Sequence, residues 1–348
     1  MTYFKNLNGL RAVAVIIVIL SHSGFSFIPG GLGVELFFIL SGFLITYLSL
    51  EDVKYSKFKL NIFFIKRFFR ILPPLIFVYF FFFFVNYFTQ YDAYVDKDVN
   101  LVWRVLFTNY YAVANGMGGL LDGMGILWSL CVEEHFYFLF PIVFLMVIKF
   151  SWKISWVFLI IILIMLAWRY LAYFHLNFEK DYFYYASEIK AIYIIAGSLL
   201  AIYFISNNSD SKKLSSTDIT LLWGSLALLF ASYFWGNSDA YRFFWRDLLH
   251  VFLLWIIFRF VLMYPQYKYF KFLETKIAKF IGKISYVLYL SHMAFVYLIA
   301  KYIELSPLLN FIFVFFISVL FAWIVLQIVE RPSSKIKNTI LKKYLQEK

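Results

Sequence analysis

The chain has 348 residues, of which 63% are hydrophobic, 24% are aromatic and only 15% are charged. Soluble domains average about 45–50% apolar and about 25% charged residues, so this composition excludes a soluble globular domain and predicts a polytopic membrane protein. The net charge of +12 comes mainly from loops between apolar runs, which favours a topology signal over a nucleic-acid partner. The single cysteine, Cys131, excludes an intramolecular disulfide and a thiolate zinc cluster.

Ten apolar runs are long enough to cross a membrane, and they predict an all-α bundle of about ten transmembrane helices. They lie near 10–28, 33–50, 72–90, 128–148, 154–174, 187–205, 217–235, 246–264, 284–302 and 308–329. The sixth run carries Lys190 and has the weakest apolar signal. The first run lacks a small-residue cleavage site, so we expect a retained helix and not a signal peptide. Residues 1–335 are expected to form one membrane domain, followed by a basic cytoplasmic tail, residues 336–348.

Lysine and arginine are distributed unequally between the loops. With the amino terminus in the cytoplasm, the outside loops hold few of them: Lys97, Arg104, Lys180, Arg242 and Lys301, with Arg246 at an edge. Because cationic residues favour cytoplasmic loops, both termini are predicted to be cytoplasmic. The longest outside segment, from Gln90 to Gly125, contains several glycines and is expected to fold over the external mouth as a lid or re-entrant loop.

Arg11 and His22 lie eleven residues apart in the first run. Eleven steps along an α-helix complete about three turns and about 16 Å, so both side chains lie on one face. Such groups on a membrane helix are costly and usually face a cavity or a partner. The structural alternatives are an interface anchor for Arg11 and a helix–helix hydrogen bond for His22. The functional interpretation makes His22 a general base and Arg11 a ligand of phosphate.

Glu35 lies near the outer end of the second run, at a depth close to that of His22. It is either a carboxylate favoured by the helix dipole or a group that orients His22 and binds substrate. Ser41 is expected to allow close helix contact, with nucleophilic attack as the less favoured alternative.

Arg67 and Arg70 precede the third run and, three residues apart, share one helix face. They are either positive-inside anchors or, together with Arg11, a clamp for a phosphate-bearing donor from the cytosol. Glu330, at the inner end of the tenth run, is expected to pair with these arginines. Pro332 is expected to end that helix.

Two adjacent carboxylates, Glu133 and Glu134, enter the fourth run. Adjacent helical residues point about 100° apart, so at least one is expected to face the protein interior. They are either structural partners of Arg169 or Arg246, or groups that bind the acceptor hydroxyl and move protons. His135 is expected to pack, with catalytic use as the minor alternative.

The ninth run places Tyr286, Tyr289 and His292 on neighbouring positions of one stripe. Tyr286 is a candidate for substrate binding, as is Trp128 at the start of the fourth run. The chain has no G-x-G-x-x-G, Walker, H-E-x-x-H or G-x-S-x-G motif.

Six segments, taken in order, resemble acyltransferase family 3, the bacterial integral-membrane O-acyltransferases of surface carbohydrates. They are LNGLRAVAVIIVILSH, GVELFFILSGFLIT, RFFRILPP, WSLCVEEHFYFLFP, ISYVLYLSH and VERP. The resemblance covers nearly the whole chain and implies about ten transmembrane helices. It also implies transfer of an acyl group, usually acetyl, from a cytoplasmic coenzyme A thioester to a sugar hydroxyl.

The resemblance also assigns residues by position. Arg11 and His22 match the Arg-x10-His pair of the family, and Arg67 and Arg70 match its Arg-x-x-Arg motif. Glu330 matches the glutamate before proline at the end of the last helix.

The fourth segment matches with two departures. Glu133 matches the first glutamate of the family pattern, whereas His135 stands where a glutamine is common and Cys131 replaces a small residue. Some relatives carry an additional extracytoplasmic esterase-like domain. Without it, this chain is expected to act alone or with a separate extracytoplasmic partner.

Together these observations predict an O-acyltransferase of the bacterial cytoplasmic membrane that transfers acetyl from acetyl-CoA to a cell-surface glycan, without a metal. In this hypothesis His22 is the base, and Arg11, Arg67 and Arg70 hold the donor phosphates. Glu330 orders the arginines and Glu133 assists catalysis. The residues predicted to contact substrate are Glu35, Glu134, Trp128 and Tyr286. Expected partners are acyl-CoA, a glycan or lipid-linked saccharide and membrane lipids, but no nucleic acid.

Two other classes of function remain as alternatives. A transporter or flippase of lipid-linked sugars also suits arginine, histidine and glutamate inside a membrane domain. A non-catalytic membrane scaffold is less favoured, because it leaves the alignment of Arg11 with His22 unexplained.

Overall fold

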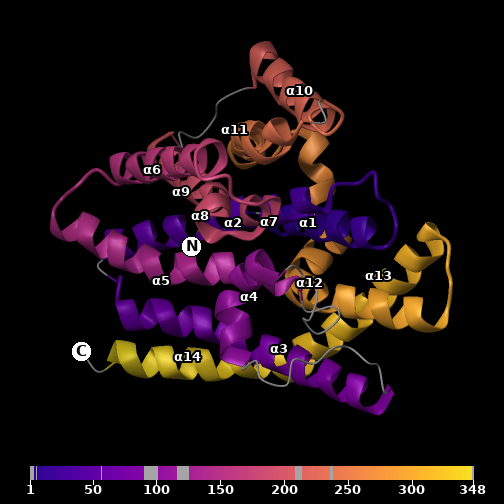
Figure 1. The fold of residues 1–348 in the computed structure, drawn as a ribbon. Coiled ribbons are helices and arrows are strands. Elements are labelled where there is room, and N and C mark those ends of the chain that lie inside the picture. Colours follow the sequence, from indigo (N-terminus) through magenta and orange to yellow (C-terminus); the bar gives the residue numbers. More distant parts are fainter. Residues whose placement is uncertain are drawn as a thin grey trace.

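The computed structural model describes residue 4 and residues 6–55, 57–89, 101–115, 125–207, 214–235 and 238–346. Every regular element within these ranges is a helix, so the all-α prediction is confirmed. The elements, drawn in Figure 1, are α1 (Leu7–His22), α2 (Gly30–Lys54), α3 (Leu60–Thr89), α4 (Leu101–Asn115), α5 (Leu127–Lys149), α6 (Ile154–Phe174), α7 (Lys180–Tyr185), α8 (Ser187–Lys190), α9 (Ile192–Asn207), α10 (Ser216–Ala231), η1 (Tyr241–Trp245), α11 (Arg246–Met263), η2 (Lys268–Glu274), α12 (Lys276–Tyr302), α13 (Pro307–Val325), η3 (Leu326–Glu330) and α14 (Arg331–Gln346).

Seven helical segments of the described chain are long and apolar enough to cross a membrane. They are α2, α3, α5, α6, α8 with α9, α12, and the continuous helix from α13 into α14. The helix of η1 and α11 forms an eighth candidate with η2, to which it is bent by 84°, whereas α1 and α10 are shorter apolar helices. Each of the ten predicted runs thus overlaps a helix, and the protein is a multi-pass membrane protein. Ten spans and cytoplasmic termini stay predictions.

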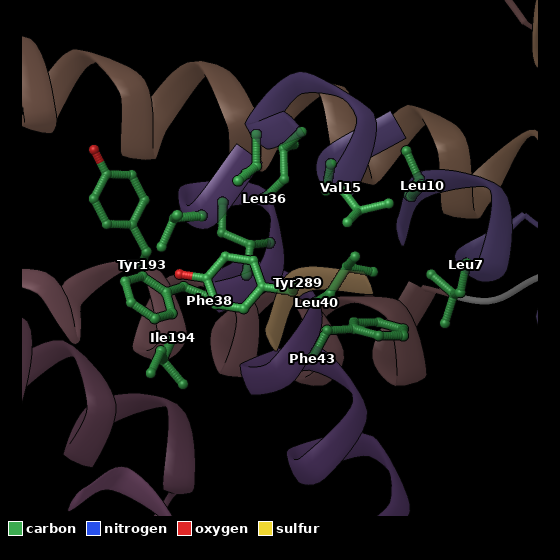
Figure 2. Close-up of a cluster of buried hydrophobic side chains, with 14 of the residues drawn as sticks. Leu7, Leu10, Val15, Leu36, Phe38, Leu40, Phe43, Tyr193, Ile194 and Tyr289 are labelled. Carbon is green, nitrogen blue, oxygen red and sulfur yellow. The ribbon is translucent and has the colours of Figure 1, made fainter. Parts of the chain in front are cut away.

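The centre of the bundle is built on α2, which packs against α1 on one side and α9 on another. Glycines bring α2 and α9 unusually close: a Cβ atom added at Gly42 would lie 1.7 Å from the Ile194 carbonyl oxygen, and one at Gly197 would lie 2.1 Å from that of Ile39. Small residues allow such backbone contact between membrane helices. Figure 2 shows the apolar side chains of this core, including Phe43 of α2 and Ile194 of α9.

The helices around this centre are arranged so that α10 and α11 lie at one edge of the bundle and α3 and α14 at the opposite edge (Figure 1). The third helix begins at Leu60, earlier than the predicted start of its run near residue 72, so Arg67 and Arg70 lie inside it. Pro73 and Pro74 lie within α3 without ending it. Transmembrane helices tolerate proline because neighbouring groups satisfy the freed backbone atoms.

Pro332 does not end the last helix, contrary to the prediction. The five residues before α14 form the π-helical turn η3, and the chain then continues as α14 to Gln346, beside α3. Proline fits the first turn of a helix because its missing N–H has no partner there, and the wider π turn precedes the ring. The predicted basic tail is therefore helical up to Gln346.

The predicted lid segment, Gln90 to Gly125, contains the helix α4, which packs against α5 and α7. Most of its glycines, together with Lys97, fall in residues 90–100 and 116–124, which lie outside the described residues. The prediction of a lid over the mouth therefore stays a prediction.

Candidate active site

Three adjoining cavities follow the length of α2. The central cavity, with a volume of about 90 Å³, is enclosed by α1, α2, α3, α5 and α12. The amino-terminal pocket, about 670 Å³, adjoins it and shares Arg11 and Leu44 with its lining. The distal pocket, about 250 Å³, adjoins it at the other end and shares Val34 and Phe38. Because α2 has 25 residues and rises about 1.5 Å per residue, the series spans roughly the thickness of a bilayer core.

The central cavity brings together the predicted arginines. Arg11 comes from α1, and Arg67 and Arg70 come from α3, yet all three line the same space. Arg11 donates to Asn8 Oδ1 at 3.4 Å, and the guanidinium of Arg67 lies over the rings of Phe63 and Tyr137. No carboxylate of the described chain lies within 4.0 Å of any of these guanidiniums. The buried Nε of Arg67 also has no hydrogen-bond partner there.

Unpaired like charges in a low-dielectric cavity repel each other, so this arginine cluster (Arg11, Arg67 and Arg70) is costly in the absence of an anion. Guanidinium groups hold phosphate and carboxylate through paired N–H bonds. The cluster is therefore suited to an anionic ligand. Glu330, which was predicted to pair with the arginines, makes no salt bridge within the described residues. It lies within electrostatic range of Arg70 and of Lys283.

Glu133 also lines the central cavity, so at least one carboxylate of the adjacent pair faces the interior, as predicted. Tyr137 donates its hydroxyl to Glu133 Oε2 at 2.9 Å. Because the hydroxyl proton of Tyr137 is used in this bond, Ser41 Oγ donates to the Tyr137 oxygen at 2.8 Å. Ser41 is thus a member of a hydrogen-bonded chain on the cavity wall, in addition to lying on the core helix α2.

His22 does not line any of the three cavities. It lies at the end of α1, where its Nδ1 is 3.1 Å from Nε2 of His292 in α12. His292 Nδ1 is 2.7 Å from the carbonyl oxygen of Tyr289, which can only accept, so this nitrogen donates. His292 Nε2 then accepts from His22 Nδ1, which leaves the lone pair of His22 on Nε2. The dyad fixes the tautomer that a general base requires.

The dyad of His22 and His292 lies beside the cavities. The ring of His292 contacts that of Tyr289, a residue of the central cavity, and Ser21 lines the distal pocket. His22 therefore follows a residue of the distal pocket in the chain, and the side chains of His292 and Tyr289 connect it to the central cavity.

Glu35 does not orient His22, which corrects one of the predicted roles. Its carboxylate lies in the distal pocket, 2.9 Å from Nδ1 of His250 in α11. His250 Nε2 lies 2.7 Å from Ser232 Oγ, whose own proton goes to a backbone carbonyl. A carboxylate can only accept, so Nδ1 of His250 donates to Glu35. The prediction failed because similar depth on two helices does not fix which faces meet.

A buried ionic network lies next to this pair. Asp247 Oδ2 accepts from Arg169 at 2.9 Å and from Lys190 at 2.8 Å, and all three side chains are buried. This network explains why the sixth run carries Lys190 in its apolar sequence: the lysine faces protein and not lipid. It also corrects the suggestion that Arg169 pairs with Glu133 or Glu134.

Of the other predicted site residues, two line a cavity and two do not. Tyr286 lines the central cavity and donates to the Ile71 carbonyl oxygen, whereas Trp128 lines the distal pocket. Glu134 lines neither, and its buried Oε1 has no partner in the described chain. His135 packs, as expected, with ring nitrogens 2.6 Å from Ser187 Oγ and 2.7 Å from the Leu106 carbonyl oxygen.

Sequence reasoning assigned no role to Asp247 and Lys190 in the distal pocket, to His250 beside Glu35, or to His292 beside His22. The signal for the first three was present, since each is a charged or ionisable residue inside an apolar run. Such residues mark interior faces, but sequence spacing does not connect one helix with another.

A family profile described as an acyltransferase domain matches residues 4–327. The chain is 29% identical, over 87% of its length, to the peptidoglycan O-acetyltransferase OatA of Listeria monocytogenes. It is 25% identical, over 96% of its length, to the O-acetyltransferase OatA of Staphylococcus aureus. The chain spans 51% to 58% of the length of the curated relatives it matches. No solved structure gives a significant match.

Proposed function

The chain belongs to the acyltransferase domain family, and on that basis we propose that it is an O-acetyltransferase of a bacterial cell-surface glycan. In this proposal acetyl-CoA is the donor, and the protein lies in the cytoplasmic membrane with both termini in the cytoplasm. Peptidoglycan is one candidate acceptor, because the Listeria relative is named for it.

The donor is proposed to enter through the amino-terminal pocket. Its volume of about 670 Å³ falls within the usual range of ligand pockets, about 300–1,000 Å³, whereas the central cavity is too small for a nucleotide. Arg11 lines both spaces, so phosphates beside it direct the thioester toward the central cavity. Arg67 and Arg70, which reach the central cavity from α3, supply further guanidinium groups for the donor phosphates.

The acceptor is proposed to approach from the distal pocket and to present a hydroxyl to Nε2 of His22. The nitrogen takes the hydroxyl proton while the oxygen forms a bond to the thioester carbonyl carbon. The carbon–sulfur bond breaks, and the sulfur takes the proton from the imidazolium to leave as coenzyme A. The products are an acetyl ester and a free thiol. His292 stabilises the imidazolium by accepting its Nδ1–H bond.

The observation that carries the proposal is the arginine cluster, which has three cations from two helices in one cavity and no carboxylate partner among the described residues. The rival function, transport of a lipid-linked sugar, suits a series of cavities equally well. It gives no reason for the tautomer of His22 to be fixed, whereas a general base requires it.

The test is acetyl transfer by the purified full chain in liposomes, with acetyl-CoA labelled in the acetyl group and cell-surface glycan as acceptor. We expect label in ester linkage to the glycan. His22→Ala should lower the rate by about 10²–10⁴-fold, the usual contribution of a general base, without loss of folding. Glycan uptake without ester formation supports the transporter, and a folded His22→Ala variant with normal turnover refutes the proposed mechanism.

A further inference from the structure

We propose that the distal pocket is a binding site for an anionic saccharide, in which a carboxylate or a phosphate on the sugar is recognised by Arg246. The inference rests on the proposed function for its place in the reaction, since it identifies the chemical class of the acceptor. The binding itself is argued from the pocket alone.

The walls of the distal pocket are aromatic. Trp128 comes from α5, Phe38 from α2 and Tyr184 from α7, so flat rings approach the space from three directions. The rings of Trp128 and Tyr184 lie with their centroids 5.6 Å apart. Sugar rings have apolar C–H faces edged by hydroxyls, and aromatic walls cover such faces while polar groups orient the ligand.

Buried polar groups among these rings provide both donors and acceptors. Lys190 is only 7% exposed, and one of its three N–H groups goes to Asp247. Glu35 is 8% exposed and uses one carboxylate oxygen toward His250. Lys190 and Glu35 both line the pocket, so a hydroxyl placed between them finds a donor and an acceptor already fixed by packing.

The charge of the pocket favours an anion. Lys190, Arg242 and Arg246 line it against Glu35 and Asp247. Both carboxylates already have donors within the protein, because His250 donates to Glu35, and the two cations Lys190 and Arg169 both donate to Asp247. Arg246 on the rim therefore adds positive charge that no salt bridge of the described residues neutralises.

Arg246 is the arginine best placed to recognise the anion. Arg246 is half-buried at the start of α11, and its guanidinium lies 5.4 Å from the centroid of the Tyr233 ring. No carboxylate in the described ranges lies within 4.0 Å of this guanidinium. Tyr184 lies within electrostatic range of Arg246, Glu35 and Asp247. A ring contact uses none of the N–H groups of an arginine, so they stay available for two parallel bonds to a carboxylate or phosphate.

The experiment compares three saccharides that differ by one group: cellobiose, cellobiuronic acid and cellobiose 1-phosphate. Their dissociation constants are measured with the purified full chain in lipid nanodiscs. We expect at least one charged saccharide to bind about tenfold or more tighter than cellobiose, the effect of a charge-assisted hydrogen bond. Preference for the uronic acid identifies a sugar carboxylate, and preference for the 1-phosphate identifies the phosphate of a lipid-linked saccharide.

Arg246→Gln should reduce that preference to less than about threefold and leave the affinity for acetyl-CoA unchanged. Lys180→Gln is the matched control, because Lys180 is a cation of the neighbouring α7 that pairs with Asp239 at 3.1 Å and does not line the distal pocket. Arg246→Lys keeps the charge but lacks the planar guanidinium, so it should give an intermediate preference. This variant replaces Arg246→Gln in the test if the glutamine variant does not fold.

Equal affinity of the wild type for all three saccharides overturns the inference, as does an Arg246→Gln variant that keeps the preference. Because binding is measured without acetyl transfer, the two proposals fail separately. If the protein prefers anionic saccharides but transfers no acetyl group, only the proposed function is refuted. If it transfers acetyl to a glycan but shows no preference for anionic saccharides, only the proposed ligand of the distal pocket is refuted.

Discussion

Replacing Arg67 by glutamine tests whether the arginine cluster holds the donor phosphates. The neighbouring Lys66 gives a matched control on the same helix, because its charge is already paired with Asp52 at 2.9 Å. Arg67 instead has a buried Nε without a partner in the described structure and lines the central cavity. Arg67→Gln therefore removes a cation available to a ligand, whereas Lys66→Gln removes one that is already used within the protein.

The expected magnitude follows from the chemistry of that cation. A hydrogen bond to a charged group contributes about 1.5–3 kcal/mol, so loss of Arg67 should raise the KM for acetyl-CoA roughly 10- to 100-fold. The kcat should change less, because phosphate binding is similar in the ground and transition states. Without ligand the variant should be as stable as the wild type or more so, since one of three like charges is gone.

Ligand-induced thermal stabilisation gives an independent assay. At a donor concentration 100 times the wild-type Kd, binding stabilises the protein by about 2.7 kcal/mol. With a Kd about 30-fold weaker, the same concentration should stabilise Arg67→Gln by only about 0.9 kcal/mol. Lys66→Gln should keep nearly the full effect. If both variants lose the same stabilisation, or if neither does, the cluster is not the phosphate site.

Three further changes probe other parts of the structure. His292→Leu should lower kcat about 10- to 100-fold with little effect on donor binding. His292→Gln should keep much of the rate, because its side-chain carbonyl can accept from His22. An equal loss of kcat in both variants contradicts the role of the dyad. Asp247→Asn leaves two buried cations without their carboxylate and should cost about 3–5 kcal/mol, seen as a lower Tm. Gly42→Ala should destabilise by about 1–3 kcal/mol through overpacking, whereas Gly224→Ala, which meets no atom within 4 Å, should not.

Hydropathy and the order of the motif segments determined the fold class and the family of this protein from sequence alone. An apolar run of about 20 residues has few ways to satisfy its backbone other than a helix, so the all-α architecture follows directly. The helix period also placed Arg67 and Arg70 on one face, because residues three apart are neighbours on any α-helix. The interior direction of Glu133, which depended on a single helix, also agrees with the structure.

The tertiary structure decided which helices face each other, and this is where sequence reasoning failed. Glu35 was a candidate partner of His22 because the two share a depth, but Glu35 binds His250, and His22 binds His292. Rotation of a helix about its axis is set by packing, such as the contact of Gly42 with the Ile194 backbone, and those contacts join residues about 150 positions apart. Periodicity within one helix contains no information about that rotation, so the distal pocket and the pairing of His22 with His292 became visible only in three dimensions.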